Sequence, residues 1–105
     1  MKRAVVFAPE AQADLTGLYD YIAERDGESR AEGYLRRIEK ACMSLETMPQ
    51  RGTDRSDLRP GLRVMGFERR VLIAFRIGQE SVAILRVLYG GRNLELAFGV
   101  STDEG

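Results

Sequence analysis

The chain has 105 residues, 44% hydrophobic and 30% charged, and its 16 basic and 16 acidic residues give a net charge of zero. These values predict one globular domain, and they exclude a disordered chain and, because no apolar run nears about 20 residues, a membrane-spanning one. The start of the chain turns polar too soon for a signal peptide, so a cytoplasmic location is expected. The chain has no histidine, which excludes a histidine-based metal site and a Ser-His-Asp triad. Its single cysteine, Cys42, excludes an internal disulfide.

The first 27 residues predict a strand followed by a helix. Residues 2–8 are short, β-branched and aromatic, which suits a strand. Pro9 is well placed at a first helical position, and Gly27 marks the end of the helix. One apolar stripe with helical spacing runs between them, formed by Leu15, Leu18, Tyr19 and Ile22.

A second helix is predicted to begin near Ser29, which with Glu32 three residues later forms a capping-box pattern. Pro49 is expected to end it. Its apolar positions alternate in steps of four and three residues: Tyr34, Ile38, Ala41, Leu45 and Met48. Because the connection is short, the two helices should form an antiparallel hairpin.

From residue 62 the hydrophobic period changes to two, which predicts three strands. The first begins at Leu62, the second covers residues 71–77, and the third covers residues 81–89, which are apolar on nearly both faces and therefore central in the sheet. Residues 92–98 are expected to pair or pack briefly. The order predicts one α+β domain over residues 1–98, a helical hairpin on a mainly antiparallel sheet, and residues 99–105 as a flexible C-terminal tail.

Arginine is concentrated in residues 51–76, which hold seven arginines against three acidic residues. This excess is either a contact surface for phosphate or carboxylate groups or a solvated loop and sheet face. Arg51, Arg55, Arg59 and Arg63 have helical spacing, but the intervening glycines and Pro60 exclude a helix. Arg59 and Arg63 bracket a predicted turn at Pro60-Gly61, and of the four they are the best candidates to meet an acidic partner.

Two arginines interrupt the apolar faces of predicted strands. Arg86 is expected to pair with a carboxylate such as Glu95 or Asp57, although it can also present a cation to a partner. For Arg76 both interpretations stay open. Tyr89 and Arg92 flank Gly90-Gly91 at a strand end, where they either contact a nucleotide or close the core.

No catalytic constellation is visible. Asp54 and Asp57 lie among arginines and are expected to pair with them rather than to form a catalytic dyad. Cys42 lies on the apolar stripe of the second helix, which favours a packed core thiol over a nucleophile. The glycines do not match a nucleotide-binding loop, and neither a cofactor nor a metal is predicted.

Several segments match known proteins in the right order: APEAQADLTGLYDYIAERDG, LETMPQRG, DLRPGLR, RVLIAFRI and ILRVLYGGRNLE. Over residues 4–96 the sequence resembles the ParE toxins of the RelE/ParE superfamily, which are plasmid stabilisation proteins of type II toxin-antitoxin systems. The resemblance implies a βααβββ fold and a toxin that inhibits DNA gyrase. It also implies a ParD-like antitoxin whose N-terminal module binds DNA, so that the toxin would contact DNA only indirectly.

The superfamily also contains RelE and YoeB, which are ribosome-dependent mRNA interferases, and this is the alternative function. By alignment, their strand arginine corresponds to Leu72, and the YoeB histidine-tyrosine pair corresponds to Leu88 and Tyr89. Two leucines cannot stabilise phosphate charge or transfer a proton, although Arg69 or Arg70 can approach the same region after a register shift. A non-catalytic binding protein is therefore expected, with these candidates for contact with the antitoxin or target: Arg59, Arg63, Arg69, Arg70, Arg76, Arg86, Tyr89 and Arg92.

Overall fold

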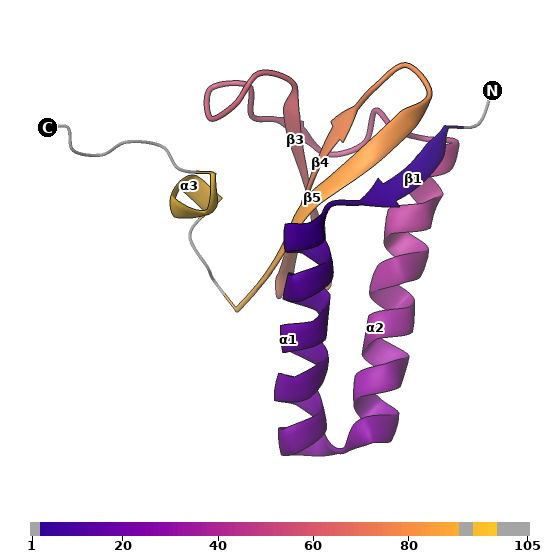
Figure 1. Cartoon of the computed structure of the whole chain (residues 1–105), viewed down its shortest axis with the longest axis vertical. Coiled ribbons are helices and arrows are strands. Elements are labelled where there is room, and N and C mark those ends of the chain that lie inside the picture. The colour runs from indigo at the N-terminus through magenta and orange to yellow at the C-terminus, as the bar shows by residue number, and fades with distance from the viewer. Residues whose placement is uncertain (1–2, 91–93, 99–105) are drawn as a thin grey trace, which may run out of the picture.

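The computed structural model describes residues 3–90 and 94–98 (Figure 1). Residues 99–105, for which a tail was expected, and Arg92 lie outside this part of the chain. The elements follow in the order β1 (Ala4–Phe7), α1 (Pro9–Asp26), α2 (Glu28–Met43), the 3-10 helix η1 (Ser44–Glu46), β2 (Thr53–Asp54), β3 (Leu62–Phe67), β4 (Val71–Ile77), β5 (Ser81–Tyr89) and α3 (Leu94–Ala97). This order confirms the predicted α+β domain with a helical hairpin.

The two long helices run antiparallel, and their lower halves extend beyond the sheet (Figure 1). A single residue, Gly27, joins them with φ 96°; its N–H donates to the Ala23 carbonyl at 2.9 Å, and its own carbonyl accepts from Ala31 at 3.2 Å. The predicted capping role of Ser29 is therefore wrong. Because the connection is one residue long, α2 already begins at Glu28, and no side chain among residues 3–90 and 94–98 caps it.

The end of the second helix also differs from the prediction. The α-helix stops at Met43, and the tighter 3-10 turn of η1 follows it. This change in winding rotates the later positions, so Leu45 remains buried while Met48 is 55% exposed. Met48 therefore does not belong to the apolar stripe, and Pro49 is buried in its place.

The sheet has five strands in the order β1-β5-β4-β3-β2. β1 is parallel to β5, and the other pairs are antiparallel, as the prediction of a mainly antiparallel sheet requires. β5 is an interior strand, but β1 reaches only as far as Ile84, and no strand in the described part of the chain pairs with the second half of β5 on that side. Ala74 pairs with Arg86 and Phe75 with Ile84, which makes Leu85 the extra residue of a β-bulge.

Both faces of the sheet carry a hydrophobic cluster. The helices cover one face, where the largest fully buried side chains include Phe75, Ile38 and Ile73. On the other face α3 and the loop before β3 cover a second cluster, which consists of Leu62, Val64, Ala74, Leu88, Leu94 and Phe98. Residues 94–98 thus pack on the sheet as expected, but as a helical turn. No helix in the described part of the chain is long and apolar enough to cross a membrane.

Candidate functional site

Four aromatic residues meet where β5 ends between the helices. Tyr89 lies 5.7 Å from Tyr21 and 6.3 Å from Tyr34, measured between ring centroids, and Tyr34 lies 6.0 Å from Phe67. We call this group the tyrosine cluster. It joins both helices to the ends of β3 and β5, so residues far apart in the sequence form one surface.

Arginines from the helices lie on the rings of this cluster. The Arg25 guanidinium lies 5.3 Å from the Tyr21 ring centroid, and that of Arg37 lies 5.1 Å from the Tyr34 centroid. Arg37 also donates two hydrogen bonds to the Glu68 carboxylate, at 3.1 and 3.2 Å, and this hydrogen bonding raises the pKa of Arg37. The Arg37–Glu68 pair thereby connects α2 to the turn between β3 and β4.

The β3–β4 turn has an unusual backbone. Glu68 and Arg69 have positive φ angles, 50° and 65°, which side chains other than glycine or asparagine rarely adopt. The Arg70 N–H donates to the Phe67 carbonyl at 3.2 Å, and the Arg70 carbonyl accepts from Gly90 at 2.9 Å. These bonds and the Arg37–Glu68 pair hold the turn in its strained conformation beside the tyrosine cluster.

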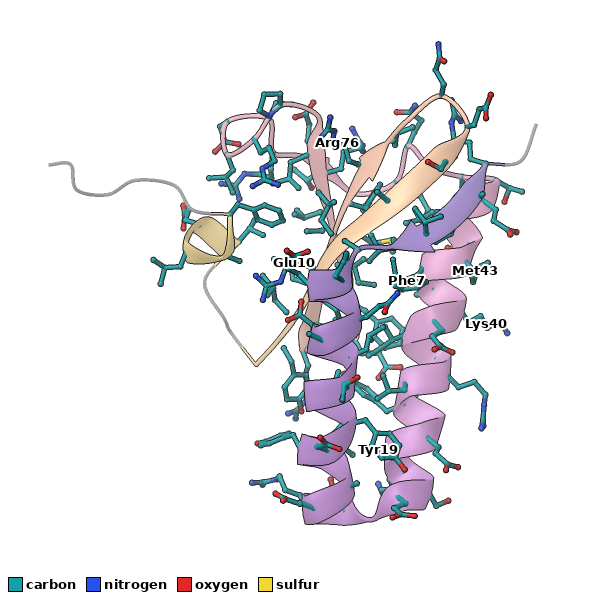
Figure 2. All side chains as sticks on the ribbon, viewed as in Figure 1. Phe7, Glu10, Tyr19, Lys40, Met43 and Arg76 are labelled. Carbon is teal, nitrogen blue, oxygen red and sulfur yellow. The ribbon has the colours of Figure 1, made fainter. Side chains whose placement is uncertain are left out.

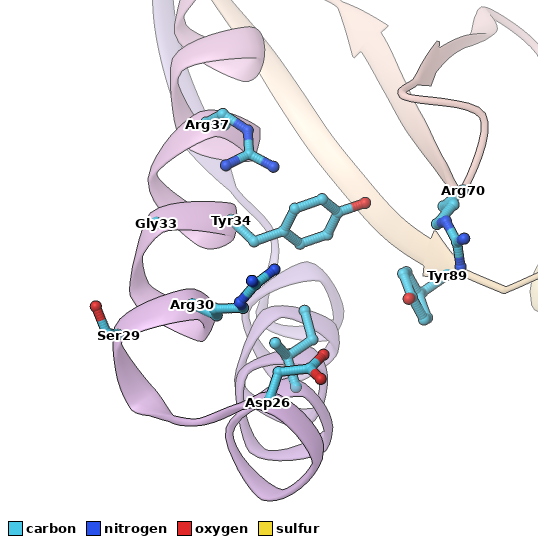
Figure 3. Close-up of a pocket in the computed structure, with 9 residues that line it drawn as sticks. Asp26, Ser29, Arg30, Gly33, Tyr34, Arg37, Arg70 and Tyr89 are labelled. Carbon is cyan, nitrogen blue, oxygen red and sulfur yellow. The ribbon is translucent and has the colours of Figure 1, made fainter.

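Two open clefts lie on either side of Tyr89. The first, which we call the arginine cleft, has a volume of about 550 Å³ and lies between α2 and the β3–β4 turn (Figure 3). Its charged side chains are Arg30, Arg37, Arg70 and Asp26. The second, of about 480 Å³, lies between α1 and the end of β5, and its walls include Gly17, Tyr21 and Val87.

Arg86 forms an internal ion pair with Asp14 of α1. Its guanidinium donates to the carboxylate at 2.7 and 2.9 Å, and the same carboxylate accepts from the Val87 N–H at 2.8 Å. The hydrogen bonding to Asp14 raises the pKa of Arg86. A carboxylate partner was predicted correctly, but Glu95 and Asp57 were the wrong residues, because α1 packs beside the half of β5 that β1 leaves uncovered.

The arginines of residues 51–63 do not form one face. Arg63 donates to the carbonyls of Gln50, Arg51 and Gly52, so its guanidinium fixes the loop before β3. Arg55 pairs with Asp57 at 2.9 and 3.0 Å, which confirms local pairing of that carboxylate. The Arg59 guanidinium lies 4.9 Å from the Phe98 ring centroid.

The two acidic residues of this loop have separate partners. Hydrogen bonds from Ser56 lower the pKa of Asp54, and the hydrogen bond from Arg55 lowers the pKa of Asp57. The expected ion pairing with arginine therefore holds for Asp57, while Ser56 provides the hydrogen bonds of Asp54.

The structure separates the predicted contact residues into groups. Arg69, Arg70 and Tyr89 lie at the tyrosine cluster. Arg76 lies at the end of β4 remote from the β3–β4 turn (Figure 2), where its stem covers Gly61, and Arg59 and Arg63 lie on either side of Gly61 in the chain. Sequence reasoning missed Arg37 and Glu68 as parts of a site, since their pairing joins segments that the sequence does not connect.

The comparisons agree on one family. Residues 5–94 match the family described as "ParE toxin of type II toxin-antitoxin system, parDE". The chain belongs to this family. A ParE relative, Toxin ParE3 of Caulobacter vibrioides, is 36% identical over 98 residues, which cover 93% of this chain and 97% of the relative. Toxin ParE1 of Mycobacterium tuberculosis is 29% identical over 89 residues, or 85% and 91% of the two chains.

A solved structure shows the same ParE fold. A chain of the "Chromosomal ParDE TA system from P. aeruginosa" superposes with a TM-score of 0.74 at 24% identity, covering 85% of this chain and 97% of that chain. The likeness extends to the helical hairpin and the mainly antiparallel sheet. It confirms the fold class expected from the resemblance to ParE.

The two leucines expected at the interferase positions both belong to the second hydrophobic cluster. Leu88 is buried, and Leu72 packs beside it in the cluster on the far face of the sheet. Burial raises the pKa of the Cys42 thiol to about 12. Among residues 3–90 and 94–98 no three histidine, cysteine or acidic side chains are grouped to hold a metal ion.

Proposed function

We propose that this chain is the toxin of a type II toxin-antitoxin pair, which binds and inhibits DNA gyrase and which a ParD-like antitoxin neutralises. The family match over residues 5–94 carries the proposal, because it spans every element from β1 to β5. The solved structure of similar fold is described as part of a ParDE system, which supports a protein partner for this chain as well.

Binding rather than catalysis is the proposed mode of action. An mRNA interferase needs groups that transfer protons and stabilise phosphate charge. The aligned positions Leu72 and Leu88 supply neither and contribute to the second hydrophobic cluster. The Cys42 thiol is buried and stays protonated at neutral pH, so it is no nucleophile.

The antitoxin is proposed to contact Arg59 and Arg76, which the fold presents together on the side of the sheet opposite the helices. Both are exposed, and neither forms an ion pair with a residue in the described part of the chain. Acidic side chains on an antitoxin segment would complement them. Arg63 would act indirectly, because its hydrogen bonds hold the loop that positions Arg59.

A supercoiling assay with purified toxin and gyrase tests the target. We expect supercoiling to fall as toxin is added and to recover when the product of the adjacent antitoxin gene is present. Unchanged supercoiling at a large excess of toxin would exclude gyrase. New cleavage in ribosomal A-site codons, lost in Arg70→Ala, would instead establish the mRNA interferase.

Copurification with the antitoxin tests the partner independently of the target. The double variant Arg59→Glu/Arg76→Glu should bind the antitoxin more weakly, by about tenfold or more. The two introduced glutamates would repel the acidic side chains that the two arginines are proposed to attract. The double variant Arg36→Glu/Lys40→Glu, on the exposed side of α2, reverses the same number of charges and should bind normally. Equal binding by all three proteins would place the antitoxin elsewhere.

A further inference from the structure

The Tyr34 side chain contains a polar group without a partner. Its hydroxyl oxygen is buried, and no hydrogen-bond partner for it exists in the described part of the chain. Buried hydroxyl groups without partners are rare, because leaving them unpaired is unfavourable. The hydroxyl points from α2 toward the side of the arginine cleft where Arg70 and Tyr89 lie (Figure 3). An acceptor that enters the cleft would satisfy it.

The Tyr34 hydroxyl is held in place as a hydrogen-bond donor. Its ring is fixed between Phe67 and Tyr89 and beneath the Arg37 guanidinium. Burial, followed by the charge of Glu68, raises the pKa of Tyr34 above its ordinary value of 10.0. The phenol therefore keeps its proton at neutral pH, and what it requires is an oxygen acceptor.

Two cations at the arginine cleft also lack carboxylate partners. The ion pairs among the described residues include neither Arg30 nor Arg70. They extend from opposite walls, Arg30 from α2 and Arg70 from the β3–β4 turn (Figure 3). The Arg70 backbone is hydrogen-bonded at both its N–H and its carbonyl, so the position from which its side chain extends is fixed. Among the described residues that line the cleft, Asp26 is the single acidic one.

We propose that the arginine cleft binds a phosphate ester, with Arg70 and Arg30 holding the phosphate and the Tyr34 hydroxyl donating a further hydrogen bond. A carboxylate carries one charge and two oxygens, which a single guanidinium can satisfy. A phosphate monoester carries about −1.5 to −2 charges at pH 7 and three acceptor oxygens, which match two arginines and a phenol. The cleft volume of about 550 Å³ leaves room for the esterified group.

The strained β3–β4 turn gives this site its geometry. Glu68 and Arg69 hold left-handed conformations, and the next residue is Arg70. Strain of this kind persists where surrounding contacts enforce it and is concentrated at functional sites. Here the Arg37–Glu68 pair enforces it from α2. The turn therefore aims Arg70 at the cleft, and this role does not depend on the antitoxin or on gyrase.

Calorimetric titration of the purified full-length chain tests the site. Inorganic phosphate and 5′-AMP should each bind with saturation. Arg70→Gln should weaken binding of 5′-AMP by about tenfold or more, and Tyr34→Phe by about threefold to tenfold. Arg69→Gln removes the same charge from the same turn but not from the cleft lining, so it should change affinity by less than about twofold.

Two checks keep the result interpretable. Tyr34→Phe removes an unpaired hydroxyl, so its thermal midpoint should be unchanged or higher, and lost binding cannot be attributed to unfolding. A 5′-phosphorylated oligonucleotide that binds more tightly than 5′-AMP would identify the ester as a nucleic acid end, while equal affinity would identify a free nucleotide.

Three results would overturn the proposal. The first is that neither phosphate nor 5′-AMP binds with saturation. The second is that Arg69→Gln and Arg70→Gln weaken binding equally. The third is that a glutamate-rich peptide displaces phosphate at equal concentration. The last result would assign the cleft to an acidic protein partner. Since the titration contains neither gyrase nor antitoxin, its failure leaves the proposed toxin function separately testable.

Discussion

Asp14 occupies a position that a neighbouring strand would otherwise fill. β1 ends beside Ile84, and beyond that point the Asp14 carboxylate accepts the Val87 N–H and two hydrogen bonds from Arg86. Its side chain is only 6% exposed, against 22% for Arg86. One carboxylate therefore neutralises a partly buried cation and caps the uncovered edge of β5.

Removing this carboxylate should destabilise the protein strongly. We expect Asp14→Ala to lower the free energy of unfolding by about 2–4 kcal/mol, somewhat less than for a fully buried pair because Arg86 retains contact with water. Urea denaturation measures the change. Asp20→Ala, on the exposed side of the same helix, should stay within about 0.5 kcal/mol. A loss below about 1 kcal/mol for Asp14→Ala would contradict this role.

The sequence predicts that Arg86 needs a carboxylate partner, but it does not predict which one. A charged residue on an apolar strand implies a carboxylate nearby, and this prediction is confirmed. Which carboxylate it is depends on how far β1 extends and how α1 packs beside β5. These are tertiary properties, because Asp14 and Arg86 lie 72 positions apart in the chain.

At the scale of elements, glycines in helices and loops have opposite roles. Gly17 lies inside α1, and a Cβ added there would meet nothing within 4 Å. Gly52 has φ 82°, and an added Cβ would collide with the Val64 carbonyl oxygen. The first position therefore tolerates a side chain, while the second requires glycine.

Alanine at these two positions should change stability in opposite directions. Gly17→Ala should raise the free energy of unfolding by about 0.5–1 kcal/mol, since alanine favours the helix and no neighbour is displaced. Gly52→Ala should lower it by about 1–3 kcal/mol through backbone strain and the collision. Chemical denaturation of the two variants in parallel decides this, and a destabilised Gly17→Ala would show that our account of α1 is wrong.

Regular elements were predictable where hydrophobic spacing is clear. The bounds of β4 and β5 agree with the expected residues 71–77 and 81–89, because β4 alternates with period two and β5 is a short apolar run bounded by turn residues. The β3–β4 turn was not predictable in its conformation. Hairpin turns with positive φ favour asparagine and glycine, and Glu68-Arg69 has neither, so long-range contacts such as Arg37–Glu68 determine it.

At the scale of the whole molecule, one thiol and two phenols that are buried or half-buried make the stability of the fold depend on pH in the alkaline range. Burial raises the pKa of Cys42 from 9.0 to about 12 and also raises those of Tyr34 and Tyr19 above 10.0. In the unfolded chain these groups lose protons at lower pH than in the native state. The unfolded state then binds fewer protons, so stability decreases as pH rises.

Stability should therefore be constant below about pH 8 with respect to these groups and decline above about pH 9, first through Cys42. Urea midpoints measured between pH 7 and 10.5 test this. Cys42→Ala should be less stable at pH 7 but show a shallower decline between pH 9 and 10. An unchanged slope in this variant would exclude the thiol as the cause.

Which residues form the tyrosine cluster and its cleft is likewise decided by the packing of the whole molecule. Tyr89 was a candidate from its place at a strand end, and Arg70 because a register shift would bring it near the position of the interferase strand arginine. Tyr34 belonged only to an apolar helical stripe in the sequence. Nothing local predicts that Tyr34 and Arg70 line the same cleft, since this depends on how α2 packs against the end of the sheet.

The parallel pairing of β1 with β5 has a consequence for the newly made protein. Synthesis begins at the N-terminus, so β1 and both long helices emerge before the residues that β1 must join, which start at Ser81. Contacts between such distant segments form late in folding. The five-stranded sheet can therefore form only after β5, Ser81–Tyr89, has been translated. The proposed toxin would therefore reach its binding-competent fold only after β5 has been made, so its proposed activity cannot begin while Ser81–Tyr89 are still untranslated.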